Sequence, residues 1–227
     1  MRAAILLVLL ALGPAAAGCG GGDDDEPAAE TATTTVAATT TAAAGACATV
    51  DQPAPREDGG ATAPEDPLDA GTTYRLVVET NCGSFTITLD QTSAPETTAS
   101  LVALARDGYF DGTSFHRVVP GFVIQGGDPT GTGTGGPGYQ TVDPPPQDTA
   151  YTRGVVAMAK TGAEPAGTSG SQFFVVTGPD AGLPPDYAVV GTVTAGLDTV
   201  LAIDGLGVGD GPPSMPVVLE KVTVEES

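Results

Sequence analysis

Several residue types are scarce in this chain of 227 residues, and each scarcity limits its chemistry. The chain contains one histidine, His116, three cysteines and no tryptophan. Because metal sites are built mainly from clustered histidine, cysteine and carboxylate ligands, the single histidine and the lack of a C-x-x-C spacing predict no metal site, and no motif indicates a cofactor. Eight basic residues against 28 acidic ones give a formal net charge of −20. This charge disfavours nucleic acid as a partner, since phosphate binding depends on clustered basic side chains.

Long hydrophobic runs are also scarce. The apolar run over residues 3–12 is shorter than the ~20 residues that a membrane-spanning helix needs, and Gly13 and Pro14 end it. One cation, Arg2, precedes the run, and small residues follow it as far as Gly18. This order is typical of a signal peptide, so residues 1–18 are predicted to be a cleaved leader.

The sequence Ala16-Ala17-Gly18-Cys19 resembles a bacterial lipobox, in which the cysteine thiol receives a diacylglyceryl group. Two acyl chains anchor a protein stably, whereas one does not. The usual pattern has leucine where Ala16 stands, and the alternative is ordinary cleavage that leaves Cys19 as a free thiol. The resemblance predicts a lipid-anchored protein at the extracytoplasmic face of the cell membrane.

Residues 19–70 consist largely of Ala, Thr, Pro, Gly and acidic residues. Such a composition buries too little apolar area to offset the entropy lost on ordering, so it predicts a flexible tether before a domain at 71–227. Apart from Cys19, the cysteines are Cys47 in this tether and Cys82 in the domain. An even pair in an exported chain favours a disulfide, and two unpaired thiols are the alternative.

The domain begins with two β-rich runs, 73–80 and 84–89, separated by Asn81-Cys82-Gly83, which predicts a hairpin. The sequence Ser93-Ala94-Pro95-Glu96 then has the S-x-x-E spacing of a helix capping box, and apolar residues follow at helical spacing up to Gly108. One helix of about three turns is therefore expected after the hairpin.

The rest of the domain is rich in short strand-like runs and Gly/Pro turns. Further strands are expected near 115–118, 123–125, 155–159, 172–176, 188–193 and 217–224, and a second helix over 197–203. Eight strands with two helices favour an all-β fold, a closed eight-stranded antiparallel β-barrel capped by the two helices. The periodicity leaves a β-sandwich as the alternative.

Four separated motifs carry a resemblance. They are the run Phe-His-Arg-Val-Val-Pro-Gly-Phe-Val-Ile-Gln-Gly-Gly-Asp over 115–128, Met158-Ala159, Gly-Ser-Gln-Phe-Phe over 170–174, and Gly191-Thr192-Val193. Their order and spacing resemble the cyclophilin family over residues 74–225. The resemblance implies a peptidyl-prolyl cis-trans isomerase on an eight-stranded barrel.

This reaction makes and breaks no bond, because its ~18–20 kcal/mol barrier comes from the amide resonance that rotation interrupts. A catalyst must favour the twisted amide, whose prolyl nitrogen gains a basic lone pair. The resemblance assigns the donor to that nitrogen to Arg117, whose guanidinium stays charged and presents its donors in a fixed plane. It places Phe122 in the pocket for the proline ring, and it gives Gln125 the role of an amide that binds a substrate carbonyl or Arg117.

The resemblance also implies a substrate-binding set: His116, Val123, Ala159, Lys160, Gln172, Phe174, Leu183 and Tyr187. Among these, Ala159 and Lys160 would bind the substrate main chain, and residues 131–138 would form a wall of the groove. Read without the family, the aromatic residues are ordinary core and Gln172 is a structural amide. The reaction moves no proton, so His116 is interpreted as a wall or scaffold residue rather than a base.

The chain departs from the family at two of these positions and at Gly182, which precedes Leu183. Lys160 stands where many members have asparagine, Gly182 where several eukaryotic members have tryptophan, and Tyr187 where the family has histidine. The missing tryptophan predicts weakened binding of the drug cyclosporin. The proposed catalytic residues are all present.

The sequence therefore predicts a monomeric prolyl isomerase that acts on proline-containing segments of exported or envelope proteins, anchored to the membrane by its N-terminal lipid. A tethered module that binds proline peptides with little turnover is a rival from another class. A barrel that serves as a spacer in an envelope lipoprotein is a second rival. Retention of Arg117, Phe122 and Gln125 favours the enzyme.

Overall fold

The computed structural model describes residues 47–227. The predicted leader, Cys19 and the first part of the predicted tether lie outside the described residues. Nine strands form one antiparallel sheet in the order β3-β11-β1-β2-β10-β7-β9-β5-β4, and β6 and β8 form a separate pair. Within the described part, no helix is long and apolar enough to cross a membrane.

The strands of the large sheet are mostly short. Their bounds are β1 Tyr74–Thr80, β2 Gly83–Leu89, β3 Thr113–Ser114, β4 Arg117–Val119, β5 Val123–Gly126, β7 Val155–Met158, β9 Phe173–Val176, β10 Val189–Ala195 and β11 Val218–Glu226. The small pair is β6 Thr141–Val142 and β8 Thr168–Ser169. Strands β1 and β2 form the predicted hairpin, in which alternate residues are buried because successive side chains of a strand point to opposite faces.

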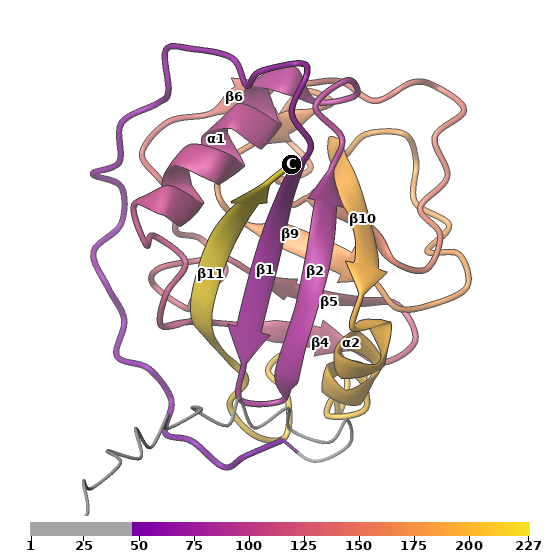
Figure 1. Cartoon of the computed structure of the whole chain (residues 1–227). Coiled ribbons are helices and arrows are strands. Elements are labelled where there is room, and N and C mark those ends of the chain that lie inside the picture. Colours follow the sequence, from indigo (N-terminus) through magenta and orange to yellow (C-terminus); the bar gives the residue numbers. More distant parts are fainter. Residues whose placement is uncertain (1–46) are drawn as a thin grey trace, which may run out of the picture. The chain divides into compact units, whose positions relative to one another are not determined.

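The sheet curls around the core but does not close, so the predicted closed eight-stranded barrel is wrong in closure and in number of strands (Figure 1). Its two ends are β3 and β4, which are successive segments of the chain separated only by Phe115 and His116. Segments joined by so short a link continue one another and cannot lie side by side as a ladder. A single isolated bridge, Ser114 to Asp128, connects β3 to the segment just after β5.

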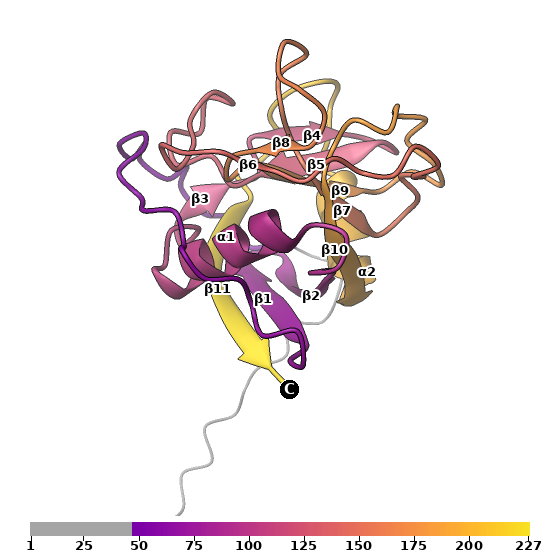
Figure 2. The same ribbon diagram turned by 90° about the horizontal axis from the view of Figure 1, so that it is seen from above.

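Helix α1, Pro95–Arg106, lies between the strands β1, β2 and β11 on one side and β4, β5 and β9 on the other (Figure 2). The predicted capping box does not form, because the Ser93 hydroxyl donates to Asp90 instead, at 2.7 Å. The carboxylate of Asp143 takes over this role from a distant loop. It accepts from the backbone N–H of Thr97 at 2.7 Å, where a negative charge suits the helix dipole.

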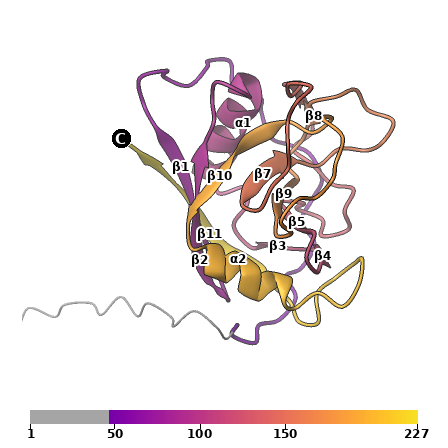
Figure 3. The ribbon, with the colours of Figure 1, turned by 90° about the vertical axis from the view of Figure 1, so that its right-hand side faces the viewer.

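Helix α2, Leu197–Asp204, lies at the opposite end of the curled sheet from α1 (Figure 3). Its buried residues Val200 and Ile203 join the main core, in which Phe85, Phe110 and Phe115 are almost fully buried. A second, smaller apolar cluster forms around Val123 and Phe174. This second cluster lies beside the strands that carry the predicted catalytic residues.

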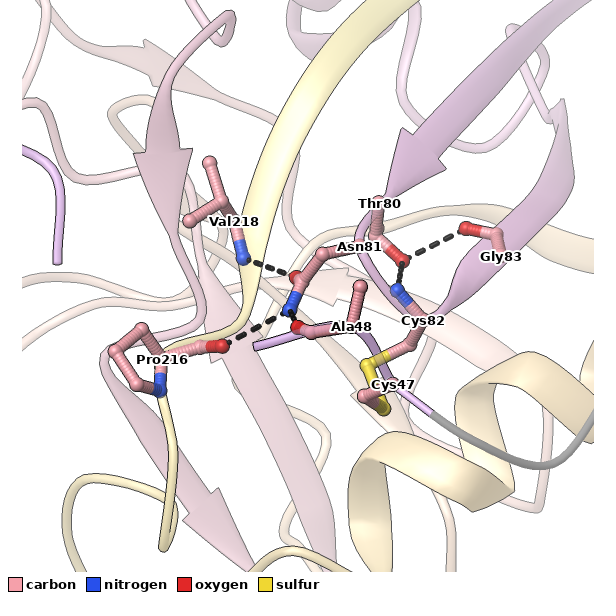
Figure 4. Close-up of a disulfide and its surroundings, with 8 residues drawn as sticks. All are labelled: Cys47, Ala48, Thr80, Asn81, Cys82, Gly83, Pro216 and Val218. Atoms are coloured by element: carbon pink, nitrogen blue, oxygen red, sulfur yellow. Dashed lines mark hydrogen bonds between the residues drawn. A yellow bond between two sulfur atoms is a disulfide. The ribbon is translucent and has the colours of Figure 1, made fainter. Parts of the chain in front are cut away.

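A segment before β1, residues 47–61, which we call the strap, lies against the domain (Figure 1). Figure 4 shows its start, where a disulfide joins Cys47 to Cys82 in the β1–β2 turn. The side-chain amide of Asn81 donates to the carbonyls of Ala48, at 2.7 Å, and Pro216, at 3.1 Å. The turn therefore links the strap to the segment that leads into β11. The predicted boundary of the domain at residue 71 stays a prediction.

Candidate active site

The predicted catalytic side chains share a row across three neighbouring strands. In register, Arg117 of β4 lies opposite Gln125 of β5, which in turn lies opposite Phe174 of β9. The Arg117 Nη1 donates to Gln125 Oε1 at 3.2 Å, and about 31% of the Arg117 side chain is exposed. Pairing of the strands thus places a solvent-accessible cation beside an amide and an aromatic ring.

The amide of Gln125 continues this contact into a chain of hydrogen bonds. Its Nε2 donates to Gln172 Oε1 at 3.0 Å, and Gln172 Nε2 donates to the carbonyl of Gly135 at 2.9 Å. The two predicted glutamines therefore lie together. They connect Arg117 to the loop over 129–138, in which the sequence predicted residues 131–138 to be a wall of the groove.

Asp210 holds the other side of the Arg117 guanidinium, and sequence reasoning missed it. Its Oδ1 accepts from Arg117 Nε at 2.5 Å and its Oδ2 from Nη2 at 3.1 Å. Hydrogen bonding to Arg117 lowers the pKa of the Asp210 carboxyl below its usual value. The carbonyl of Gly211 accepts from the backbone N–H of Val118 at 2.8 Å, which fixes the loop after α2 against β4.

The predicted apolar residues gather in the second cluster. Phe122, Leu183 and Tyr187 pack against a buried group that contains Val123 and Phe174. The rings of Phe174 and Tyr187 meet edge to face, with centroids 5.6 Å apart. These residues come from three separate parts of the chain, so tertiary packing assembles them.

Tyr151 is a further member of this cluster that the sequence did not indicate. Its ring is 1% exposed, its hydroxyl donates to the Tyr187 carbonyl at 2.8 Å, and it accepts from the Tyr187 N–H at 3.0 Å. Both polar functions of the hydroxyl are thus satisfied inside apolar surroundings. Tyr151 fixes the backbone that carries the Tyr187 ring.

The turn between β4 and β5, which carries Phe122, is bound by a side chain of α2. The carboxylate of Asp204 accepts from the backbone N–H of Gly121 at 3.0 Å and from the Thr177 hydroxyl at 2.6 Å. Gly121 has a φ of 68°, in the left-handed region that favours glycine. The Pro-Gly-Phe motif therefore forms a turn that combines a local hydrogen bond, from the Phe122 N–H to the Val119 carbonyl at 3.0 Å, with these contacts from α2 and Thr177.

The Lys160 side chain has contacts that the motif did not indicate. Its side chain is 2% exposed, and its Nζ lies 2.5 Å from Asp186 and 3.1 Å from the Glu164 carbonyl. The ammonium also lies 5.4 Å from the centre of the Tyr187 ring. This side chain fastens its own loop. Main-chain binding of substrate by Ala159 and Lys160 stays a prediction, and the Ala159 N–H already donates to the Gln172 carbonyl at 2.9 Å.

His116 lies between β3 and β4, with both ring nitrogens buried and without hydrogen-bond partners among residues 47–227. Burial lowers the pKa of His116 below its ordinary value, so the ring is neutral at pH 7. A buried neutral imidazole suits the predicted scaffold role.

A cavity of about 610 Å³ adjoins the row of predicted catalytic side chains. Gln125 and Gln172 form one side of it, and the loop from Gly133 onward forms another. Asp58 of the strap also lines it, although the sequence placed that residue in a flexible tether. The site therefore has two parts, an apolar cluster and a more polar cavity, with Gln125 between them.

These features define a class of protein: an all-β domain with a surface cavity, beside which an arginine and an amide border an apolar cluster. Residues 75–224 match the family model described as "Cyclophilin type peptidyl-prolyl cis-trans isomerase/CLD". The chain belongs to this family.

Known relatives agree with this assignment. Peptidyl-prolyl cis-trans isomerase-like 1 of Gibberella zeae is 36% identical over 162 residues, which cover 68% of this chain and 97% of the relative. Peptidyl-prolyl cis-trans isomerase B of Bacillus subtilis is 47% identical over 108 residues, covering 47% and 73%. A crystal structure of a Cryptosporidium parvum cyclophilin-type isomerase matches with a TM-score of 0.62 and 30% identity, covering 67% of this chain and 98% of that chain.

Proposed function

We propose that this protein accelerates the cis-trans isomerisation of X-Pro bonds in exported or envelope proteins. The observation that carries the proposal is the Arg117 guanidinium, which lies beside Gln125 at the edge of the apolar cluster around Phe174. The family and the names of the relatives support it. A second crystal structure of the Cryptosporidium protein, with a TM-score of 0.61, was determined in the presence of the dipeptide Ala-Pro.

The apolar cluster suits a proline ring, and the guanidinium suits the nitrogen of the twisted amide. Arginine has five N–H donors. Each of the three guanidinium nitrogens donates one hydrogen bond: Nε and Nη2 donate to Asp210, and Nη1 donates to Gln125. Two of the five N–H groups therefore have no partner among the described residues. These two donors are available to a substrate.

The energetic contribution of Arg117 is limited. A hydrogen bond to a charged group contributes about 1.5–3 kcal/mol net, which corresponds to roughly ten- to a hundredfold in rate. The apolar cluster must supply the rest by holding the ring and by excluding the water that stabilises the planar, polar amide. Phe122 and its neighbours are therefore as important as the cation.

Exchange spectroscopy by two-dimensional NMR on a peptide with one Ala-Pro bond tests the proposal. We expect the protein to accelerate exchange between the cis and trans peaks, and Arg117→Ala to lose roughly ten- to a hundredfold of that acceleration. Arg106→Ala is a matched control, because Arg106 is an exposed arginine paired with Glu226 far from the apolar cluster. Peptide binding without any acceleration by the native protein would favour the rival adaptor.

We also propose export and lipid anchoring at the extracytoplasmic face of the membrane. The leader-like residues 1–18 and the lipobox at Cys19 support this in the sequence, and the Cys47–Cys82 disulfide suits an oxidising compartment. Mass spectrometry of the mature N-terminus tests it. A diacylglyceryl mass on Cys19 is expected, and a chain released without modification would contradict it.

A further inference from the structure

The strap is bound to the loop that forms one wall of the groove. The backbone N–H groups of Arg56, Gly59 and Ala61 donate to the carbonyls of Pro129, Gly136 and Pro137, at distances from 2.9 to 3.0 Å. These three main-chain bonds keep the strap in one alignment with the loop over 129–138. The strap is therefore a neighbour of the groove throughout residues 56–61.

Close packing supports the same alignment. A Cβ atom added to Gly138 would lie 3.1 Å from the Gly59 Cα, so glycine at position 138 allows an approach that a larger residue there would hinder. Gly138 also has a φ of 92°, in the left-handed region. Strap and loop thus meet at a contact that depends on the identity of Gly138.

Asp58 is the strap residue that faces both the loop and the cavity. Its Oδ1 accepts from the Gly136 N–H at 2.7 Å, and its Oδ2 has no hydrogen-bond partner among the described residues. The residue lines the cavity of about 610 Å³ that also touches Gln125 and Gln172. One carboxylate oxygen orients the side chain, and the other is free to meet a ligand.

The charges that line this cavity are unbalanced. Its charged lining residues are Asp58, Lys160 and Glu164. The Lys160 side chain is 2% exposed and its ammonium lies 2.5 Å from Asp186, so its charge is already neutralised inside the protein. Glu164 accepts hydrogen bonds from Thr161 and Gln140 but keeps its negative charge. The cavity therefore presents a net negative charge to whatever enters it.

We propose that the strap is part of the substrate groove and that Asp58 makes this groove prefer segments with a lysine or arginine near the proline. The inference rests on the proposed function, because the cavity joins the catalytic row through Gln125 and Gln172. A substrate whose proline occupies the apolar cluster continues along the groove into this cavity. The segment before β1 thus selects substrates, in addition to joining the domain to the rest of the chain.

The test compares peptides that are identical except for lysine or glutamate two residues before the proline, and a second pair changed two residues after it. The ratio of kcat/KM for lysine over glutamate measures the preference. It is determined for the native protein, Asp58→Asn and Glu57→Gln. In Asp58→Asn, the asparagine keeps a side-chain oxygen that accepts from the Gly136 N–H. Glu57 is an exposed neighbour of equal charge, so each variant removes one negative charge from the strap. Comparing the two variants shows whether the preference depends on the position of the charge or only on the net charge.

We expect the native protein to prefer lysine in one of the two pairs, through KM. Asp58→Asn is expected to reduce that preference about two- to fivefold, the range for exposed ion pairs, and Glu57→Gln is expected to leave it unchanged. The preference should also weaken between low and high salt. Equal rates for lysine and glutamate peptides, or equal losses in the two variants, would overturn the inference.

Loss of the proposed function would be visible separately. If the native protein accelerates exchange in no peptide, the isomerase proposal fails. The charge preference is then measured as peptide affinity, from the shifts of the Gln125 and Gln172 side-chain amide signals on titration. A lysine preference in affinity that Asp58→Asn reduces supports the role of the strap, and its absence refutes that role.

Discussion

Replacing Asp210 by alanine removes the carboxylate that holds the Arg117 guanidinium from the side opposite Gln125. Two effects then compete. Without Asp210 the guanidinium loses two of its three protein hydrogen bonds and samples more orientations, which lowers the rate. It also loses a neutralising charge, which strengthens the remaining donors and raises the rate.

Orientation should dominate this competition. The Asp210 side chain is 68% exposed, so water and salt screen the neutralising effect, whereas the geometry of the two hydrogen bonds is lost completely. Exposed ion pairs of this kind are expected to change a rate about two- to fivefold. We therefore expect Asp210→Ala to lower kcat/KM about two- to fivefold, with the loss mainly in kcat.

A double-mutant cycle on the Ala-Pro peptide checks the reasoning. Asp210→Ala, Arg117→Ala and the double variant are compared by exchange NMR, with Glu220→Ala as an exposed acidic control on β11. If Asp210 acts through Arg117, its removal has no effect once Arg117 is gone. An equal loss in both backgrounds would show a general effect on the loop after α2. A faster Asp210→Ala enzyme would show that neutralisation outweighs orientation.

Three further predictions follow from the contacts of the site and the strap. Reducing the Cys47–Cys82 disulfide, which closes a loop with a sequence separation of 35, should lower the free energy of unfolding by about 2–4 kcal/mol in thermal melts. Leu183→Ala should raise KM roughly fivefold by removing about 1 kcal/mol of apolar contact, and Leu201→Ala on the exposed face of α2 should not. NMR titration should place the His116 pKa below its ordinary value; because the unfolded chain binds that proton more readily, stability should fall as pH drops through the unfolded and then the folded pKa.

The family was recognised correctly from the sequence because each of its motifs is local in the chain. Arg117, Phe122 and Gln125 lie within one run, and the pairing of β4 with β5 follows from the Pro-Gly turn between them. The helix start was misread for the opposite reason. The capping-box pattern near Ser93 was present, but a carboxylate from a distant loop, Asp143, occupies the helix N-terminus.

The missed residues share a different property. Asp210 lies 93 positions from Arg117, and Asp58 lies 78 positions from Gly136. No periodicity or local motif connects residues so far apart, and an acidic residue in a chain with 28 of them carries no signal of its own. The composition of the strap predicted flexibility because it counts apolar area, and the strap is held instead by main-chain hydrogen bonds and a disulfide.

By itself, the sequence determined the acidic character of the protein, the opening hairpin and the motifs of the family, because each depends on residue types and short spacings. Tertiary structure decided which groups meet. The sheet stays open between β3 and β4, and both Asp210 and Gln125 accept from the Arg117 guanidinium. The rings of Phe174 and Tyr187 are in contact, and Asp58 lines the cavity. The physical reason is that such contacts form only after long loops have closed, and short-range preferences carry no information about which loops close together.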